Sequence, residues 1–364
     1  MEVVMATIPA PLARTVERIR HQVGRVHLRL VPAPVSMIEL ILGAWVSQAI
    51  QAAAQLRVAD ALASGPLPLE ELARRVGADP EALGRLLRAL ISRGIFRQDR
   101  RGRYALNALA DTLRSDSPVS MAAAAKFYGS PQHREHWSML VDSIRSGRAS
   151  IPVLRGKEFF EYLDDEPELA QLFNDTMTNI SDMAQESVVT AYPFTNETIV
   201  DVGGGHGRLL AAVLAANPDA QGVLYDLPQV VANAPALLER TGVASRVHVE
   251  GGSFFEKVPA GGDVYLLKLV IHDWPDDEAV TILRNVRDAA GPGSRVVLVE
   301  GVIPDHDRDF IGKWVDLEML LGANGRERRA VEYRELLRRS GLEMTRVVQT
   351  ASPFSLIEAT PAVS

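Results

Sequence analysis

Cysteine is absent from this chain of 364 residues. Its absence excludes disulfides, cysteine-ligated zinc, iron–sulfur clusters and catalysis by a thiol. A long apolar run is also missing, because no stretch of about 18 uncharged apolar residues occurs. The most apolar stretch, Met37–Leu56, is interrupted by Glu39, Gln48, Gln51 and Gln55. The sequence therefore predicts no membrane span.

Positive charge is in short supply as well. The chain has 39 Lys and Arg against 46 Asp and Glu, a net charge of −7, which does not favour nucleic acid as a partner. Residues Met1–Ala10 lack the basic start and apolar core of a signal peptide, so we expect a cytoplasmic protein. The hydrophobic share of 47% is enough for a sizeable core.

The residue patterns divide the chain into four predicted parts. Residues 1–35 form an arginine-rich extension that closes at Pro32 and Pro34, and we expect it to pack in a dimer or to be mobile, with an acidic or membrane partner as the alternative. Residues 116–190 read as a helical connecting region. The other two parts, which carry clearer patterns, are residues 36–115 and residues 191–364.

Residues 36–115 have the pattern of a winged helix. A long helix is expected over 36–64, followed by short helices over 69–76 and 80–93. Asp79 is the expected N-cap and Gly94 the expected C-cap of the last of these. A polar turn between two short apolar segments then predicts a β-hairpin. Binding of DNA by the arginines of this part is an alternative to a role in dimerisation.

Apolar strand-like runs alternate with helical stretches from residue 191 onward. This alternation predicts an α/β fold with a doubly wound sheet, whose ligand lies at the carboxyl ends of the strands. The predicted strands cover residues 199–202, 222–225, 246–249, 264–270, 295–300 and 345–349.

A glycine-rich turn follows the first of these strands. Asp201 precedes it, and Gly203, Gly205 and Gly207 lie within it. The dinucleotide fingerprint G-x-G-x-x-G does not fit, because the third glycine comes one position early. The D-x-G-x-G-x-G form resembles motif I of class I S-adenosylmethionine (SAM) methyltransferases, whereas an ordinary tight turn is the alternative. Asp226 ends the next strand, 226 − 203 = 23 residues after Gly203, and suits the hydroxyls of a ribose.

Later strands end in further candidate residues. Ser253 and Phe254 follow the third strand, where Phe254 can stack on an adenine and Ser253 can bond its edge. The fourth strand delivers Lys268 and then His272, which is placed to act as a general base. Glu300 ends the adjacent strand and Glu327 follows a predicted helix over Phe310–Leu321, so either carboxylate can orient the imidazole. Asp316 on that helix is interpreted as a surface or capping acid.

These segments together resemble the SAM-dependent O-methyltransferase 2 family, over roughly residues 36–360. The family includes caffeic acid and acetylserotonin O-methyltransferases and bacterial enzymes that tailor natural products. The resemblance rests on Val200–Gly207, Asp226–Pro228, Gly252–Phe255, Lys268–Trp274, Glu300 and Gly325–Arg328. It implies a class I methyltransferase domain, with a mainly helical winged-helix domain for homodimerisation.

The resemblance also implies roles for single residues. SAM is the expected cofactor, S-adenosylhomocysteine (SAH) its product, and no metal is expected. The implied cofactor-binding residues are Asp201, Gly203, Gly205, Asp226, Ser253, Phe254, Lys268 and Ser181. His272 matches the catalytic base, flanked by Glu300 and Glu327. The implied acceptor pocket comprises Phe173, Met177, Asp273 and Asn324. Ser253 stands where the family commonly has Asp, which reshapes the recognition of adenine.

The expected reaction is methyl transfer from SAM to a hydroxyl of a small aromatic acceptor, most simply a phenol. One alternative is another chemistry on the same fold, such as N- or C-methylation, hydroxylation or decarboxylation. A second alternative is a winged-helix regulator that binds duplex DNA in a salt-dependent way and turns nothing over. The residues that would select one acceptor are not identified by the sequence.

Overall fold

The computed structural model describes residues 9–322 and 324–362, without the side chains of Asp182 and Met183. Most of the segment Met1–Ala10, on which the expectation of no signal peptide rests, lies outside the described residues. The contacts divide the chain into two compact units. The sheet unit comprises the chain up to Gln22, Asp142–Glu158 and everything from Ser181 onward. The helical unit comprises Val23–Val141 and Phe159–Ile180.

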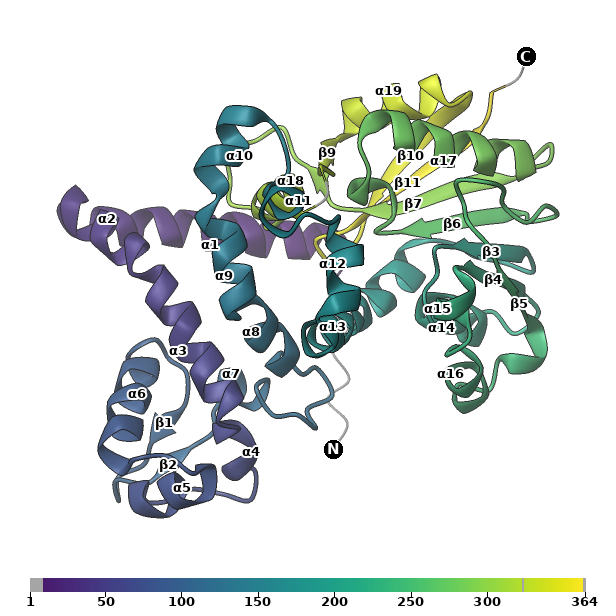
Figure 1. Ribbon diagram of the computed structural model, residues 1–364. Helices are drawn as coiled ribbons and strands as arrows, with labels where there is room; N and C mark the ends of the chain where they lie inside the picture. Colours follow the sequence, from purple (N-terminus) through teal and green to yellow (C-terminus); the bar gives the residue numbers. More distant parts are fainter. Residues whose placement is uncertain (1–8, 323, 363–364) are drawn as a thin grey trace. The chain divides into compact units, whose positions relative to one another are not determined.

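The helical unit holds the predicted winged helix (Figure 1). Its core consists of apolar residues such as Leu72, Leu83, Leu87 and Phe96, all buried. Its elements are α2 (Ala33–Ile41), α3 (Gly43–Gln55), α4 (Val58–Ala61), α5 (Leu69–Val76), α6 (Pro80–Ser92), β1 (Arg97–Gln98), β2 (Tyr104–Ala105), α7 (Ala108–Asp111), α8 (Ala122–Tyr128), α9 (Pro131–Ser138) and α12 (Phe159–Asp165). Three helices run across the division between the units: α1 (Ala10–Arg29), α10 (Leu140–Ser146) and α13 (Pro167–Ala191).

The expectation of one helix over residues 36–64 is wrong. The segment is divided into α2, α3 and α4, with breaks at Leu42 and at Arg57, whose φ is +55°. The turn at Arg57 directs Val58 and Ala59 into the core, where both are buried. Packing of these side chains therefore overrides the helical pattern of the sequence.

Both predicted ends of α6 are confirmed. The Asp79 carboxylate accepts the N–H of Ala82 at 2.9 Å. At the other end Gly94 has a φ of +76°. The N–H groups of Gly94 and Ile95 donate to the carbonyls of Ile91 and Leu90 at 2.9 and 3.0 Å, the Schellman pattern that satisfies the last carbonyls of a helix.

The helix pair α2–α3 is more apolar than its interruptions by Glu39 and three glutamines indicate. Over Ala33–Gln55 it is long and apolar enough to cross a membrane, by length and composition only, and 6% of its most apolar window is buried. Glu39 and the glutamines interrupt this stretch but leave its mean hydropathy high, at 1.4. The large exposed side chains of this helix pair are Val35, Met37, Ile38, Leu40, Ile41 and Trp45.

The sheet unit is built on a seven-stranded sheet in the order β10-β11-β7-β6-β3-β4-β5. The strands from β7 to β5 are parallel, and β11 and β10 add an antiparallel edge. The strands are β3 (Thr198–Val202), β4 (Gln221–Asp226), β5 (Val247–Gly251), β6 (Val264–Lys268), β7 (Arg295–Glu300), β10 (Leu342–Gln349) and β11 (Ser355–Pro361), with a separate pair β8 (Val302–Ile303) and β9 (Arg328–Arg329). The doubly wound fold predicted from the alternating pattern is confirmed.

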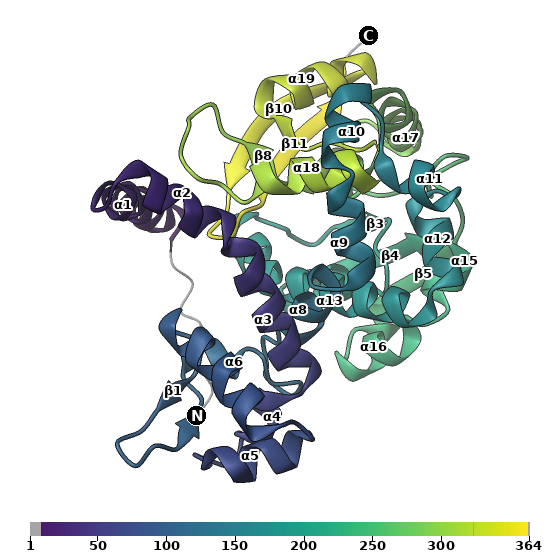
Figure 2. The same ribbon diagram turned by 60° about the vertical axis from the view of Figure 1, so that its left-hand side comes forward.

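Helices cover both faces of this sheet (Figures 1 and 2). α17 (Asp276–Ala289) and α19 (Ala330–Arg339) pack on one face, against Val200, Tyr265 and Leu298 among others. α14 (Arg208–Ala216), α16 (Pro235–Arg240) and the end of α13 pack on the other, against residues that include Ile199 and Leu266. The remaining helices are α11 (Ser150–Arg155), α15 (Pro228–Val231), α18 (Gly312–Gly322) and the 3-10 turns η1 (Ala244–Arg246) and η2 (Ile271–Asp273).

The chain reverses its winding direction at β3. From β3 it proceeds to β4 and β5 on one side, and then returns to β6 and β7 on the other. Loops that leave the carboxyl ends of β3 and β6 therefore diverge to opposite faces and leave a crevice between them, where ligands of such sheets bind. The glycine turn follows β3, and His272 lies in η2 just after β6.

We predict that Asp79→Ala destabilises the helical unit by about 1 kcal/mol, because the amide of Ala82 loses its partner at the start of α6. Urea denaturation followed by far-ultraviolet circular dichroism measures the change. Arg85→Ala, an exposed position on the same helix, is the control and stays within about 0.5 kcal/mol. An equal stability of the two variants would contradict the role of the cap.

Candidate active site

The glycine turn between β3 and α14 has a backbone that larger residues do not readily adopt. Gly203, Gly205 and Gly207 have φ of +69°, +60° and +80°. A Cβ on Gly203 would lie 2.8 Å from Cγ2 of Val270, and a Cβ on Gly204 would lie 2.6 Å from Cγ of Asp201. The Cβ position of Gly205, in contrast, has no atom within 4 Å. The turn therefore packs tightly against the sheet on one side and leaves open space on the other.

Asp201 lies beneath this turn and is buried. Within the described part of the chain, its Oδ2 atom has no hydrogen-bond partner. Burial raises the pKa of the Asp201 carboxyl to about 7; the charge of Asp226 acts in the same direction and that of Lys268 opposes it. An ionisable group so desolvated, directly below an open glycine turn, is a mark of a binding site rather than of a simple connection.

Asp226 at the end of β4 reaches the same turn. One of its carboxylate oxygens accepts the N–H of Gly205 at 2.8 Å, and the other accepts the N–H of Leu227 at 2.7 Å. The side chain is half-buried. The structure thus brings together Asp226 and the glycine turn, which the sequence placed 23 residues apart.

Ser253 and Phe254 follow β5 and lie at the same edge of the sheet. The Phe254 ring is 3.5 Å from the Cβ position of Gly203 and lies edge-on to the Trp274 ring, with 6.1 Å between the centroids. The Asn285 amide donates to the Phe254 carbonyl at 2.8 Å, while the Ser253 Oγ accepts the N–H of Phe255 at 3.3 Å. Phe254 is therefore held beside the glycine turn.

His272 is buried and surrounded by carboxylates. Its Nδ1 lies 2.9 Å from Oε1 of Glu327, and its Nε2 lies 3.4 Å from Oδ1 of Asp273. Glu300 approaches from the end of β7, where its Oε1 accepts the N–H of Ile271 at 2.9 Å. The pairing of β6 with β7 thus brings Glu300 to the turn that carries His272.

These charges set the protonation of the cluster. Burial alone lowers the pKa of the His272 imidazole, but Asp273, Glu300 and Glu327 outweigh it and raise that pKa to about 10. Burial raises the pKa of the Glu300 carboxyl to about 7, although the charge of His272 opposes the shift. Burial also raises the pKa of Asp273. The cluster therefore has a strong tendency to hold protons.

Arg328 fixes the turn on which His272 lies. Its side chain is buried, and its guanidinium donates to the carbonyls of Ile271 at 3.0 Å and Trp274 at 2.9 Å. It also pairs with Asp276 at 2.8 Å. A planar group with five donors can hold several acceptors in one arrangement. Arg328 therefore ties both ends of the His272 turn to the start of α17.

The segment before Arg328 holds the backbone of His272. The N–H of Arg326 donates to the His272 carbonyl at 2.8 Å, and a Cβ on Gly325 would lie 2.3 Å from that carbonyl oxygen. The N–H of Glu327 donates to Oδ1 of Asp316 at 2.9 Å. Asp316 is therefore not a surface acid, because it fixes the backbone of the residue that holds His272.

The other predicted site residues lie in several elements. Phe173 packs against Phe159 and Phe127 in the helical unit, with centroid distances of 5.2 and 5.5 Å. Met177 and Ser181 follow on α13 and are half-buried. Asn324 has a φ of +56°, and its side-chain Oδ1 accepts the N–H of Ala149 at 2.6 Å. Asn324 therefore positions the start of α11.

Sequence reasoning missed the roles of Arg328 and Asp316. Arg328 stood in a recognised segment without a function, and an arginine that is 1% exposed cannot be told from a surface arginine by its neighbours in the sequence. The predicted helix over Phe310–Leu321 is α18, which begins at Gly312. Its placement, rather than its pattern, turns Asp316 toward Glu327.

His272, Glu300 and Glu327 also meet the distance requirement of a metal site. One potential ligand atom from each lies within 4.8 Å of the others. Two of the carboxylate oxygens already accept hydrogen bonds, from Ile271 and from His272. The arrangement thus serves an imidazole held between carboxylates, and the expectation of a metal-free site stays a prediction.

Known proteins share both parts of this chain. The O-methyltransferase domain matches residues 137–343, and the O-methyltransferase dimerisation domain matches residues 38–116. A phenazine O-methyltransferase, PhzM of Lysobacter antibioticus, is 39% identical over 332 residues, which cover 91% of this chain and 97% of the relative. An 8-amino-8-demethylriboflavin N,N-dimethyltransferase of Streptomyces davaonensis is 32% identical over 314 residues, or 85% of this chain and 90% of the relative.

A solved structure agrees with the fold. The SAH-bound crystal structure of CalO1, a methyltransferase in calicheamicin biosynthesis, superposes with a TM-score of 0.83 at 34% identity, and covers 91% of this chain and 98% of its own. This chain belongs to the O-methyltransferase family and is a SAM-dependent O-methyltransferase with a family dimerisation domain.

Proposed function

We propose that this enzyme transfers the methyl group of SAM to a phenolic hydroxyl of a small aromatic natural product, with His272 as the general base. The observation that carries the proposal is the 2.9 Å contact between Nδ1 of His272 and Glu327. With Nδ1–H donated to a carboxylate, Nε2 is the nitrogen that can take up a proton from an acceptor.

The residues at the glycine turn suit SAM. The open side of Gly205 gives backbone access to a ligand, the Asp226 carboxylate can accept hydrogen bonds from ribose hydroxyls, and Phe254 presents an aromatic ring beside the turn. The unpaired Oδ2 of Asp201 lies directly beneath. When bound, SAM supplies a methyl carbon made electrophilic by its sulfonium, so the protein needs to supply only position and a base.

The carboxylates around His272 bring the pKa of its imidazole close to that of a phenol. A phenol has a pKa of about 10, and Asp273, Glu300 and Glu327 raise the pKa of His272 to about 10 despite its burial. Transfer of the proton between groups of similar pKa is close to thermoneutral. Glu327 and Glu300 then stabilise the imidazolium that results.

The aromatic class of the acceptor is supported by the relatives. The relative at 39% identity is named for a phenazine acceptor, and the relative at 32% identity is named for an aminoriboflavin acceptor. Both acceptors contain fused aromatic rings. The second relative transfers methyl groups to an amine, so N-methylation of an aromatic amine is the second candidate. An aromatic amine has no hydroxyl proton to lose before it attacks, so its methylation would depend little on His272.

We predict that His272→Ala slows methyl transfer to a phenolic acceptor at least about a hundredfold, the usual contribution of a positioned base. Binding of SAM stays nearly unchanged. Transfer of radiolabel from SAM, with SAM affinity measured by calorimetry, tests both statements. His248→Ala, on an exposed side chain of β5, is the control and keeps full activity. An unimpaired His272→Ala enzyme would remove His272 from the mechanism.

We predict that kcat/KM rises with pH and that the midpoint of this rise lies above pH 6.5. His272 must be neutral to accept a proton, and the carboxylates hold its pKa at about 10. Glu327→Gln removes one of these charges, so the midpoint of the rise moves to lower pH. Asp277→Asn, at an exposed ion pair with Arg339, leaves it in place. The pH profile is measured with an acceptor whose hydroxyl pKa is known. A midpoint that Glu327→Gln does not shift would contradict the account.

We predict that removal of metal ions leaves the reaction unchanged. Hydrogen bonds to Ile271 and His272 already engage the carboxylates of the cluster, so no cation is needed to hold it. Activity after dialysis against EDTA should agree with the untreated enzyme within about twofold. Loss of activity that a divalent cation restores would assign the cluster to a metal instead.

A further inference from the structure

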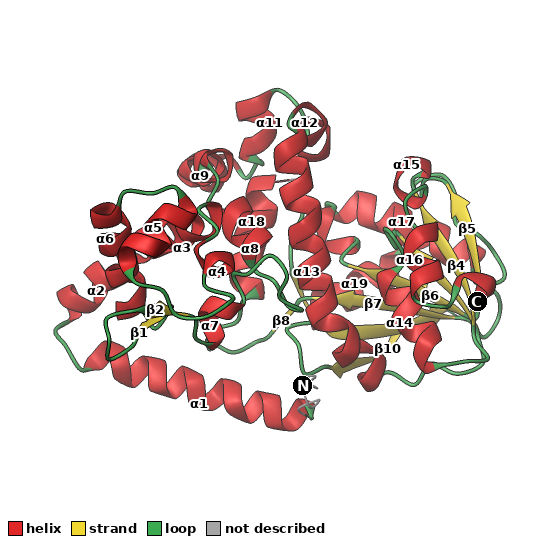
Figure 3. Ribbon diagram, turned by 90° about the horizontal axis from the view of Figure 1, so that it is seen from below, coloured by secondary structure: helices red, strands yellow, loops and turns green. Residues whose placement is uncertain are grey.

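α1 carries an apolar seam that its own chain does not cover. Apolar residues recur along it at alternating intervals of four and three, and continue one residue past its end. None of the residues of α1 is buried, and the members of the seam are 42% to 74% exposed. We call this set the α1 seam: Leu12, Val16, Ile19, Val23, Val26 and Leu30. Figure 3 shows α1 as one continuous helix.

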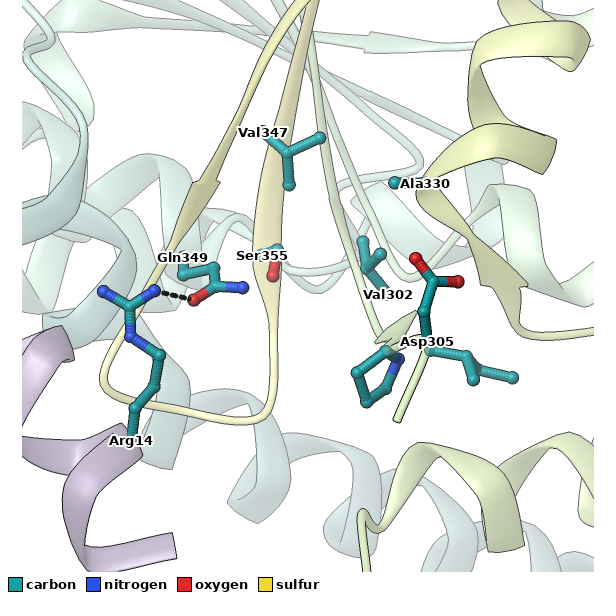
Figure 4. Close-up of a pocket in the computed structure, with 9 residues that line it drawn as sticks. Arg14, Val302, Asp305, Ala330, Val347, Gln349 and Ser355 are labelled. Atoms are coloured by element: carbon teal, nitrogen blue, oxygen red, sulfur yellow. Dashed lines mark hydrogen bonds between the residues drawn. The ribbon is translucent and has the colours of Figure 1, made fainter. Parts of the chain in front are cut away.

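The opposite face of α1 is the one that contacts its own chain. Arg14 donates to the Gln349 amide oxygen at 2.5 Å and lines, with Asp305 and Ser355, a cavity of about 560 Å³ (Figure 4). Glu17 lies 3.5 Å from the Arg308 guanidinium. At about 100° per residue, the face that bears these two residues is centred more than about 160° from the α1 seam.

This orientation is the reverse of that expected for a helix on a protein surface. Such a helix normally turns its apolar face inward, whereas α1 docks through polar groups and presents the seam to solvent. The four–three spacing is the a/d repeat of a coiled coil, in which the complement of one seam is a second seam. A contiguous apolar stripe of this length on a soluble chain marks an interaction site.

We propose that the α1 seam packs against the same seam of a second copy of this chain. The dimerisation domain matched over residues 38–116 begins shortly after α1. The Ser36 hydroxyl, which is buried, donates to the Leu28 carbonyl at 2.7 Å, so the end of α1 is tied to the start of α2. α2 and α3 also carry exposed apolar side chains, among them Met37, Leu40 and Trp45. α1 thus extends the dimer interface beyond the segment that the family domain covers.

A membrane surface fits these observations less well. The α1 seam follows a narrow a/d repeat and holds no aromatic residue. Helices that lie in a membrane interface commonly insert aromatic residues, and their charged face stays in water. Here Glu17 and Arg14 of the polar face are engaged by the chain itself.

The chain offers a clean test because it has no cysteine. In the full-length enzyme, Ile19→Cys places one thiol near the centre of the seam, where a two-fold axis brings the two copies together. Mild oxidation should convert most of the protein to a covalent dimer. Arg25→Cys, about 120° from Ile19 around the helix, is the matched control and should stay uncrosslinked. A dimeric Ile19→Cys enzyme that forms no crosslink overturns the pairing of the two seams.

A second measurement does not depend on crosslinking. Ile19→Glu combined with Val23→Glu should raise the dimer dissociation constant at least about tenfold in sedimentation velocity, while Arg18→Glu with Arg25→Glu changes it less than threefold. Because α1 buries no residue within its own chain, the seam variant should keep its SAM affinity. An unchanged dimer dissociation constant overturns the proposal. If the same variant has lost binding to phosphatidylserine vesicles, the α1 seam is a membrane-binding surface instead.

Discussion

The hydrogen bond between Nδ1 of His272 and Glu327 is the interaction on which the proposed chemistry depends. It selects one tautomer of the imidazole, and so decides which nitrogen faces an acceptor. Arg328 holds the two ends of the His272 turn, and Asp316 holds the backbone of Glu327. A contact between two side chains is thereby supported by three elements: β9, α18 and the start of α17.

The sheet explains why these groups meet and why their charges matter. β3, β6 and β7 are neighbours, so the glycine turn, His272 and Glu300 all leave the same edge. Burial at this edge raises the pKa of the Asp201 carboxyl and that of the Glu300 carboxyl to about 7. Desolvation of a charged group costs free energy unless a partner compensates for it. The carboxyl edge of the sheet therefore concentrates desolvated carboxyl groups, which the proposed cationic cofactor and the proposed proton transfer would compensate.

Part of this arrangement could be read from the sequence, because it depends on local patterns. Six strands of the sheet, the glycine turn, the cap at Asp79 and the family itself follow from spacing and residue type, whereas β11 was not predicted. Three other features follow from tertiary packing, and no local pattern carries them. Arg57 breaks a helical pattern so that Val58 reaches the core, Arg328 is buried although arginine is usually a surface residue, and Asp316 turns inward only because of where α18 lies.

Histidine-specific NMR tests the central claim most directly. In enzyme with SAM bound and with ¹⁵N-labelled histidine, the His272 signals can be assigned by their loss in His272→Gln. The account predicts that Nδ1 keeps its proton in the hydrogen bond to Glu327 throughout, while Nε2 titrates well above pH 6.5. A His272 that loses its Nδ1 proton, or whose midpoint lies at or below 6.5, would contradict a base held and adjusted by carboxylates.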